Sequence, residues 1–542
     1  MGSAALNFDY VIVGAGSAGC VVANRLSEDP GVRVCLVEAG PSDRKFPVNV
    51  KSRVPVGNAF FRLDQRYNWL FGYTGEPHLH DRTIPCPRGK LLGGTSQLNG
   101  MVYMRGQPQD YDDWAALGNA GWAWRDVLPY FRKSENFELG GNAFHATGGE
   151  LNVAAQRSPN KLTHEFLEAA AQTQLPRNDD FNGATQEGFG FFHLTQKNGE
   201  RWATSRAFLH PVLSRPNLTV ISDAQALKIE FAGRRATGVR LQRGGEVFTV
   251  NAAREVVLSS GSIGSPHILL LSGVGPAEQL RRHGIEVVAD LPGVGQNLQD
   301  HPDVRVTMSE RSRLSWGRSL PALLRLAFSP FPFVAARKGP LTATAVEAGG
   351  FLKVAPGATR CDVHFVFTPQ ILDRTRYLPT MHGFSIHVSL LRPKSRGFLE
   401  LASADPAAAP ILHPNFLSEE DDTRLLVAGL RVARRILSAP ALQRYAVQEV
   451  DPGASVERDE ALADYVRKNV ATIFHPVGTC KMGSDAMAVV DPQLRVRGIE
   501  GVRVIDASIM PNLVSGNTNA PAIMIGEKGS DLIRARQVAA AA

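Results

Sequence analysis

Two segments near the C-terminal end combine a titratable base with neutral amides. His475 opens the segment HPVGTC (475–480), and Asn519 lies in GNTNAP (516–521), which leads into an apolar stretch. Because the pKa of an unperturbed imidazole is near 6.5, His475 is largely unprotonated at neutral pH and can accept a proton. The amide of Asn519 cannot take a proton, but it can hold a substrate oxygen and stabilise a developing alkoxide. We therefore predict that His475 and Asn519 form a catalytic pair for redox chemistry on an alcohol.

The beginning of the chain predicts a nucleotide-binding βαβ unit. Its predicted elements are a strand, a helix and a second strand, at residues 8–13, 20–26 and 32–37. Gly14, Gly16 and Gly19 lie between the first strand and the helix, where they allow a tight turn and close approach of a pyrophosphate. Unpaired N–H groups at the helix start favour the phosphates. Glu38 ends the second strand, where it can accept a hydrogen bond from a ribose hydroxyl, so we predict dinucleotide binding.

The composition is that of an ordinary globular enzyme. The 542 residues are 44% hydrophobic and 20% charged, and this length favours two domains. The net charge of +7 is spread without a dense Lys/Arg tract, so we expect no nucleic acid partner. No C-x-x-C pair occurs among the five cysteines, Cys20, Cys35, Cys86, Cys361 and Cys480. A disulfide framework or zinc site is therefore not expected, and without a signal-peptide pattern we expect a cytoplasmic protein.

The rest of the chain shows two kinds of sequence pattern. Glycine-rich segments typical of turns recur at residues 88–96, 261–266 and 293–297. Alternating runs within residues 304–465 predict antiparallel strands, and residues 418–437 have helical periodicity. We therefore predict an α/β (α+β) fold, in which a substrate-binding domain with an antiparallel sheet flanked by helices interrupts a Rossmann-like domain. The predicted Rossmann-like domain comprises residues 1–155, 214–303 and 465–542, and the substrate-binding domain residues 156–213 and 304–464.

Five motifs together resemble one family. They are RGKLLGGTSQLNGMVYMR (88–105), GSIGSPHILLLSGVG (261–275), VGQNLQDH (294–301), HPVGTC (475–480) and VRVIDASIMP (502–511). With them the sequence resembles the glucose-methanol-choline (GMC) family of flavin-dependent oxidoreductases over nearly the whole chain. Residues 196–218 and 391–401 are similar to bacterial alcohol dehydrogenases acting on aliphatic alcohols and, next, to choline dehydrogenases. The resemblance implies FAD rather than NAD, and thus an FAD-binding Rossmann-like domain.

The same resemblance implies which residues border FAD. It assigns the pyrophosphate to Gly14, Gly16, Ser17, Ala18 and Gly19, and the adenosine ribose to Glu38 with Ala39. Bordering the flavin ring and its ribityl chain it implies Arg88, Gly93, Gly94, Ser96, Asn99, Gly100, Met101, Asp506, Ala507, Asn517 and Pro521. Some relatives carry a histidine joined covalently to the flavin one residue before the position of Asn99. This residue is Leu98 here, and leucine has no nucleophilic atom, so we predict non-covalent FAD.

For the reaction, the resemblance implies oxidation of a primary, aliphatic alcohol to the aldehyde. His475 would take the hydroxyl proton, the flavin N5 the hydride, and a quinone or other acceptor the electrons. Relatives carry either His or Asn at the second catalytic position, here taken to be Asn519. The rate should then fall as the pH drops through the histidine pKa. The alternatives are a choline dehydrogenase-like enzyme, an alcohol oxidase using O₂ and, more distantly, a flavin-containing hydroxynitrile lyase.

Two further residues are candidates for the substrate cavity. Glu347 would favour a cationic alcohol if it faced the cavity, with a structural hydrogen bond as the equal alternative. His387 lies in a predicted strand and is a second candidate contact. No metal is expected, because neither this histidine nor His364 or His382 has convincing metal-ligand companions.

Residues 311–338 mix basic and apolar side chains. Charges and two prolines interrupt the segment, which therefore cannot span a bilayer. It can instead lie in a membrane interface, with Trp316, Phe331 and Phe333 among lipids and its arginines against phosphates. Peripheral association with the cytoplasmic face of the inner membrane is one expectation for the segment. The alternative is a lid or helix packed on the substrate-binding domain.

Overall fold

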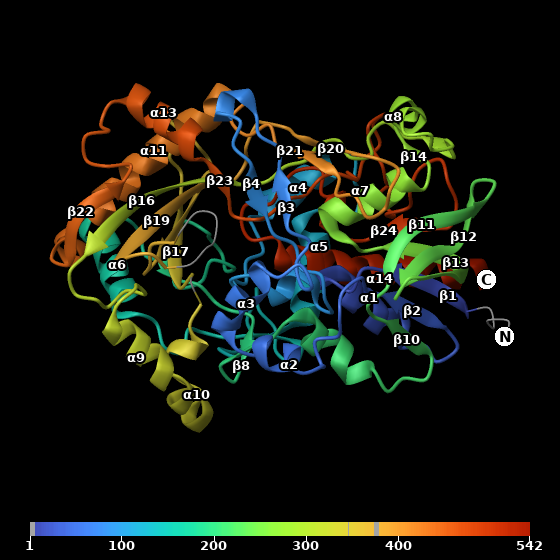
Figure 1. The fold of residues 1–542 in the computed structure, drawn as a ribbon, viewed down its shortest axis with the longest axis horizontal. Helices are drawn as coiled ribbons and strands as arrows, with labels where there is room; N and C mark the ends of the chain where they lie inside the picture. The colour runs from blue at the N-terminus through green and yellow to red at the C-terminus, as the bar shows by residue number, and fades with distance from the viewer. Residues whose placement is uncertain (1–5, 345, 373–378, 542) are drawn as a thin grey trace.

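The computed structural model describes residues 6–344, 346–372 and 379–541, and its first large sheet carries the predicted βαβ unit (Figure 1). The spatial order is β10 (Leu218–Ile221), β2 (Val34–Val37), β1 (Leu6–Val13), β13 (Glu246–Leu258), β12 (Arg235–Arg243) and β11 (Gln225–Ala232). The strand β24 (Val502–Val504) also pairs with β13. Helix α1 (Ser17–Leu26) connects β1 to its parallel neighbour β2. The pairing is parallel from β10 to β13, and all four residues of β2 are buried, as expected of a strand covered on both faces.

The second sheet is antiparallel and lies at the other end of the molecule (Figure 1). Its order is β22 (Ala446–Asp451), β16 (Pro302–Glu310), β19 (Gly383–Leu390), β18 (Val363–Thr368), β17 (Ala348–Leu352) and β7 (Gly188–Phe191). Helices α6 (Lys161–Gln172) and α11 (Glu420–Leu437) pack on it. In α11, buried Leu426, Leu430 and Ala433 form the apolar stripe that faces the sheet. The α/β fold with an antiparallel sheet flanked by helices is thereby confirmed.

The two sheets draw on separate parts of the chain. The first takes its strands from three stretches, around residues 6–37, 218–258 and 502–504. The second takes its strands mainly from 188–191 and 302–451, and β23 (Ala471–Thr472) adds to β16 from beyond the predicted boundary at 464. The chain therefore passes from the second sheet back to the first immediately after β23. The exact domain limits stay a prediction.

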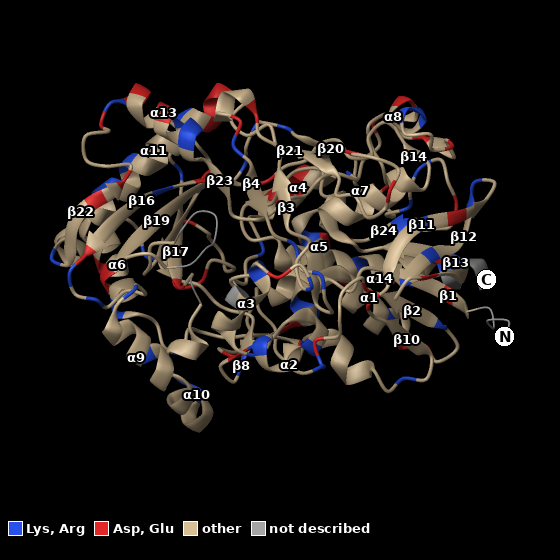
Figure 2. Cartoon of the chain, in the orientation of Figure 1, with Lys and Arg blue, Asp and Glu red and all other residues tan. Residues whose placement is uncertain are grey.

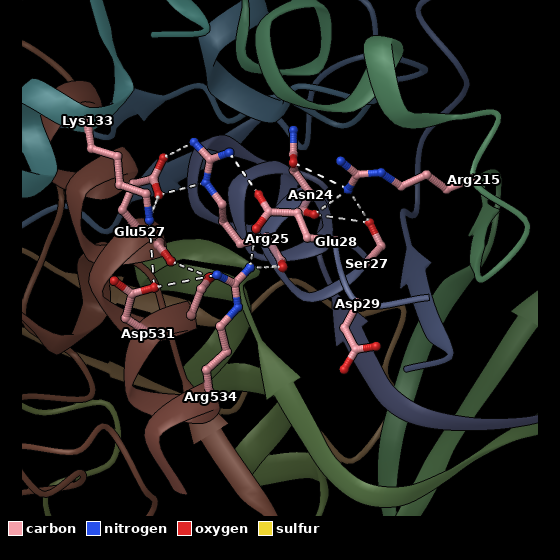
Figure 3. Close-up of polar contacts among 12 residues, drawn as sticks. Asn24, Arg25, Ser27, Glu28, Asp29, Lys133, Arg215, Glu527, Asp531 and Arg534 are labelled. Carbon is pink, nitrogen blue, oxygen red and sulfur yellow. Dashed lines mark hydrogen bonds and ion pairs between the residues drawn. The ribbon is translucent and has the colours of Figure 1, made fainter. Parts of the chain in front are cut away.

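Ion pairs connect the last helix, α14 (Asn519–Ala541), to α1 (Figure 3). The Arg25 guanidinium, in α1, is only 6% exposed and donates to both carboxylate oxygens of Glu527 in α14, at 2.6 and 2.8 Å. It also donates to Glu150, while Lys133 from α5 (Trp124–Ser134) lies 3.1 Å from Glu527. Glu527 is fully buried, so its charge depends on these partners. The cluster holds the first half of α14 against the nucleotide-binding helix.

We expect Glu527→Ala to lower the free energy of unfolding by about 3 kcal/mol, because it removes one carboxylate from buried Arg25 while Glu150 remains. Urea unfolding followed by circular dichroism measures the loss. Glu28→Ala is the matched control, since the Glu28 side chain is 40% exposed and its pairs with Arg25 and Arg534 should each contribute less than about 1 kcal/mol. Equal losses in the two variants would contradict a dominant role for the buried pair.

Candidate active site

A cavity of about 500 Å³ is bordered by both sheets and by the loops that join them. Its wall includes the β1–α1 turn, the ends of β2 and β13, residues 94–95 and 98–102, strands β16 and β18, and the loops that contain His475 and Asn517. This size is typical of sites that enclose a cofactor and a small substrate. The cavity therefore brings together segments that are more than 500 residues apart in the chain.

Glycines shape the end of the cavity beside α1. Gly14 has a φ of +100°, and a Cβ there would lie 2.5 Å from the carbonyl oxygen of Ser259. A Cβ on Gly94 would lie 2.8 Å from the Cα of Gly16, so two loops meet where no side chain fits. Helix α1 begins at Ser17 and directs its first N–H groups toward this end. Backbone groups rather than side chains are therefore exposed to a ligand, as pyrophosphate binding requires.

Two buried carboxylates border the same region. Glu38 accepts hydrogen bonds from the backbone N–H groups of Ala15 and Gly40, at 3.0 and 2.9 Å, and burial raises its pKa to about 7. Its remaining lone pairs suit the hydroxyl donors of a ribose. Asp506 accepts from Gly261 N–H and the Ser265 hydroxyl, at 2.9 and 2.5 Å. These bonds hold the beginning of α7 (Gly261–Leu271) at the cavity wall.

Most of the residues predicted to contact the cofactor line this cavity. They are Gly14, Gly16, Ser17, Ala18, Glu38, Ala39, Arg88, Gly94, Asn99, Gly100, Met101, Asp506, Ala507 and Asn517. Four others lie behind the wall, namely Gly19, Gly93, Ser96 and Pro521. Gly19 packs on the Gly14 carbonyl, and the Ser96 hydroxyl donates to the Gly93 carbonyl. These four positions therefore do not line the cavity themselves.

His475 is buried beside the cavity and is neutral. Its backbone N–H donates to Asp300 Oδ1 at 2.7 Å, and its Nδ1 lies 3.0 Å from the Nδ1 of His301. Burial, followed by the electrostatic influence of nearby His301 and Arg88, lowers the pKa of His475 well below its usual value. The imidazole therefore holds a free lone pair at neutral pH, which a general base needs.

Asn517, and not Asn519, lies next to the base. The Asn517 Nδ2 is 3.2 Å from His475 Nε2, whereas the Asn519 Oδ1 accepts from the Ser17 hydroxyl at 2.7 Å. Asn519 is the first residue of α14, so its side chain faces the beginning of α1. Asn517 belongs to the preceding loop. In this loop Gly516 has a φ of +156° and packs closely against Met104. The structure thus does not form the predicted His475–Asn519 pair, and the amide at the base is two residues earlier.

The two substrate candidates have different surroundings. Glu347 lies off the cavity wall, where its Oε2 accepts from the Asn160 N–H and the Thr163 hydroxyl at the beginning of α6, at 2.8 and 2.5 Å. The structural hydrogen bond, which was the alternative for Glu347, is therefore the arrangement seen. His387 does line the cavity, with its Nδ1 2.8 Å from Asp303 Oδ2. No three His, Cys, Asp or Glu side chains are placed to hold a metal among the residues described.

Sequence reasoning missed three residues around the base. Asp300 and His301 end the motif VGQNLQDH, and both hydrogen-bond to His475. His364 on β18 lines the cavity, stacks on Phe351 and has no partner at either ring nitrogen. The adjacent acid and imidazole of Asp300-His301 were a readable signal, but only the fold shows that they face His475.

Unpaired polar atoms indicate what the cavity is built to hold. Asn517 Oδ1 and Arg88 Nε are buried without a partner, and both residues line the wall. Buried polar groups are nearly always hydrogen-bonded, so these atoms call for a polar ligand. Together with the glycine turn, the α1 terminus and Glu38, they fit a flavin dinucleotide in size and polarity. Leu98 also lines the wall, with no nucleophilic atom.

Comparison with known proteins identifies the family. Two family models described as GMC oxidoreductase match residues 8–303 and 393–526. An alcohol dehydrogenase (acceptor) of Pseudomonas putida is 44% identical over 97% of this chain and 95% of its own length. The mitochondrial choline dehydrogenase of Homo sapiens is 40% identical over 97% of this chain and 90% of its own.

Solved structures agree with this relationship. Pyridoxine 4-oxidase from Mesorbium loti matches with a TM-score of 0.86 and 28% identity over 98% of this chain and 99% of its own. An Aspergillus oryzae formate oxidase, studied for its FAD modification, matches with a TM-score of 0.89 and 26% identity over 99% of both chains. The cavity, with its glycine turn and His475, thus occurs in a chain whose whole length matches flavoenzymes. The chain belongs to the GMC oxidoreductase family, and its cofactor is FAD.

Proposed function

We propose that this FAD-dependent alcohol oxidoreductase acts on primary aliphatic alcohols and delivers the electrons to a quinone-type acceptor. The observation that carries the proposal is the placement of His475 Nε2 and the Asn517 amide 3.2 Å apart at the cavity wall. Val346, Val366 and Leu372 add apolar surface to that wall. The carboxylate of Glu347, the candidate partner for a cationic alcohol, is directed to α6 instead. These features support a neutral substrate over choline.

The chain's own residues perform the proton chemistry. His475 Nε2 accepts the hydroxyl proton, which is worth about 10² to 10⁴-fold in rate. The Asn517 amide donates to the same oxygen and stabilises the negative charge that develops on it. When bound, FAD would supply the acceptor for the hydride from the adjacent carbon. Backbone N–H groups at the beginning of α1 and the Glu38 carboxylate would hold the dinucleotide in place.

Anaerobic mixing with a panel of alcohols tests this proposal. Aliphatic, aromatic, polyol and choline-type alcohols are compared by the rate at which the flavin absorbance bleaches. We expect primary aliphatic alcohols to react fastest, and choline to react slowly. Faster reduction by choline would overturn the substrate assignment, and an unchanged spectrum with every alcohol would favour a lyase. Hydrogen peroxide formed in proportion to turnover in air would identify an oxidase instead of a quinone-linked enzyme.

We also propose that FAD is held without a covalent bond, because Leu98 supplies no nucleophile at the wall. Acid precipitation of the purified protein should therefore release the flavin quantitatively into the supernatant, as measured by its absorbance. A covalent flavoprotein treated in parallel is the control, because its flavin stays with the precipitate and gives a yellow pellet. A yellow pellet from this protein would contradict non-covalent binding.

Peripheral attachment to an anionic membrane is the proposed location for the exchange of electrons with a lipophilic quinone. Helices α9 (Leu320–Phe328) and α10 (Pro330–Ala336) project from the molecule (Figure 1), and α9 has no buried residue. Phe328 and Phe331 are 70% and 82% exposed. Residues 311–346 contain six Lys or Arg and no Asp or Glu, and Figure 2 shows no acidic residue on these helices. No helix among the described residues is long and apolar enough to cross a bilayer.

The exposed side chains differ in part from those expected. Phe333 is buried, and Trp316 is half-buried beside Gln370, so of the three expected aromatics only Phe331 is available for lipid. A second exposed apolar group, which includes Phe46 and Phe60, occurs in residues 46–63. Its 3₁₀ turn (Pro55–Asn58) contacts the turn Pro340–Thr342, which contacts α10. The two groups therefore belong to neighbouring parts of the surface.

Replacing both Phe328 and Phe331 with Ser should lower co-sedimentation with anionic liposomes at least roughly tenfold, since each buried Phe side chain stabilises binding by about 1.5 to 3 kcal/mol. Leu139→Ser is the matched control, because Leu139 is 63% exposed on a different part of the chain. Binding of wild type should weaken when anionic lipid is replaced with zwitterionic lipid. Unchanged binding by the double variant would overturn the membrane proposal and leave the alcohol chemistry untouched.

A further inference from the structure

The hydrogen atoms of His301 can be placed from its neighbours. Its Nε2 lies 3.1 Å from the Val514 carbonyl oxygen and 3.2 Å from the Leu391 carbonyl oxygen. Carbonyl oxygens only accept hydrogen bonds, so the Nε2 of His301 must carry a hydrogen. His301 is fully buried, which makes an unsatisfied alternative costly.

His301 is also neutral at ordinary pH. Burial lowers its pKa to about 4, and Arg392 adds a positive potential in the same direction. The other titratable neighbours of the two imidazoles are Arg88 and His364, which also disfavour added positive charge. The nearby Asp300 carboxylate contacts backbone N–H groups, Tyr73 and Thr472 rather than either ring. With Nε2 protonated and the ring neutral, the Nδ1 of His301 is a lone-pair acceptor.

The tautomer of His475 follows from this acceptor. The two Nδ1 atoms are 3.0 Å apart, and a hydrogen bond between them needs one donor. Since His301 Nδ1 has no hydrogen, His475 Nδ1 must supply it. The Nε2 of His475 then carries the lone pair, and it faces the Asn517 Nδ2 donor at 3.2 Å. Donor and acceptor roles are consistent along the whole chain of contacts, from the two carbonyls to the cavity.

One carboxylate fixes the positions of both histidines. Asp300 Oδ1 accepts the backbone N–H of His301 at 2.8 Å and that of His475 at 2.7 Å. Residues 174 positions apart in the chain are therefore attached to the same oxygen. The ring-to-ring contact thus depends on a rigid backbone arrangement and not on flexible side chains.

We propose that His301 is a positioning residue that holds His475 in the Nδ1–H tautomer, so that its basic Nε2 always faces the substrate hydroxyl. The inference rests on the proposed role of His475 as the base. A neutral imidazole partner orients the ring without raising its basicity, whereas a carboxylate partner would favour the protonated form of His475. The base therefore stays unprotonated before the alcohol binds, and its hydrogen bond to His301 strengthens as it gains charge.

Nitrogen NMR of protein labelled with ¹⁵N-histidine tests the tautomer without any turnover. The His475 signals are assigned as those lost in His475→Gln, and the spectra are recorded with FAD bound. We expect a hydrogen on Nδ1 and none on Nε2 in the wild-type protein near neutral pH. A hydrogen found on Nε2 of His475 would overturn the inference, whatever the behaviour of the variants.

Two variants of His301 connect the tautomer to the reaction. His301→Leu removes the acceptor and should mix the two tautomers and slow anaerobic flavin reduction at least roughly tenfold, because a misplaced hydrogen removes the general base. His301→Asn retains an acceptor oxygen near the Nδ1 position, and should recover the tautomer and most of the rate. A wild-type rate and tautomer in His301→Leu would refute the positioning role of His301 but leave His475 as the base. A wild-type rate in His475→Ala would instead refute the proposed role of His475 as the base. Equal losses of the flavin-reduction rate in His301→Leu and His301→Asn, with the wild-type tautomer of His475 in both, would also refute the positioning role of His301.

Discussion

Replacing His475 with Ala should slow reduction of the flavin by an alcohol at least roughly 10²-fold while FAD stays bound. The imidazole Nε2 is the group aimed at the hydroxyl, and the other wall groups next to it, the Asn517 amide and the neutral His364, are poor bases. FAD should stay bound because the glycine turn and Glu38, which would hold the dinucleotide, do not depend on the His475 side chain. Anaerobic stopped-flow absorbance at saturating alcohol measures the rate, and the flavin-to-protein ratio measures occupancy.

A surface histidine provides the matched control. His283 follows helix α8 (Ala277–Arg282) and lies outside the cavity wall, so His283→Ala should reduce its flavin at the wild-type rate. A near-normal rate in His475→Ala would remove His475 from the mechanism. A loss of FAD in that variant would instead mean that the residue supports cofactor binding.

The pH dependence should depart from that of an ordinary histidine. Because burial lowers the pKa of His475, its basic form persists below the usual value near 6.5. The rate of flavin reduction in wild type should therefore be constant from pH 8 through about pH 6.5 and fall only at lower pH, as His475 becomes protonated. A flat profile near neutrality is thus compatible with a histidine base, and the expected fall of the rate moves to a pH below the usual histidine pKa. A midpoint at or above about 6.5 would show that the bound flavin or substrate cancels the effect of burial.

Replacing Asn517 with Ala should lower the rate of flavin reduction by roughly 10²-fold, whereas Asn519→Ala should act mainly on cofactor binding. Removing one donor to a developing oxyanion typically costs about 10² to 10³-fold, and only Asn517 is within reach of His475 Nε2. Asn519 contacts Ser17 at the beginning of α1, so its loss should weaken FAD binding or stability. Reduction rates and FAD dissociation constants, measured in both variants, separate the two roles. The pairing seen here would be contradicted if Asn519→Ala had the larger effect on the rate of the FAD-loaded enzyme.

Local patterns predicted much of the fold and part of the site. The βαβ unit was readable because strand, glycine turn, helix and second strand are contiguous, and each has a strong period or turn signal. His475 was readable from its motif. The choice between Asn517 and Asn519 was not, because it depends on where α14 begins, and helix ends are uncertain by one or two residues. A shift of two residues directs the amide to α1 instead of to the base.

Contacts between distant segments were beyond the reach of sequence reasoning. Glu347 carries a carboxylate that could bind a cationic substrate, yet it accepts hydrogen bonds from the beginning of α6, which it meets only in the folded chain. Phe333 and Phe331 are two residues apart, and helix geometry rather than composition decides that one is buried. His301 contacts His475 across 174 positions. Such pairings are set by sheet topology, which single-sequence patterns do not encode.

Because the first sheet is built from distant parts of the chain, it can be completed only late in synthesis. The strand β24, at residues 502–504, pairs with β13 beside the nucleotide-binding strand β1. At about 5 to 20 residues per second, the ribosome releases β24 some tens of seconds after β1. During that interval the nascent nucleotide-binding unit has neither its last strand nor the loop that contains His475. FAD can therefore be captured in its complete site only near the end of translation, so cellular flavin supply should influence how much newly made chain reaches the native state.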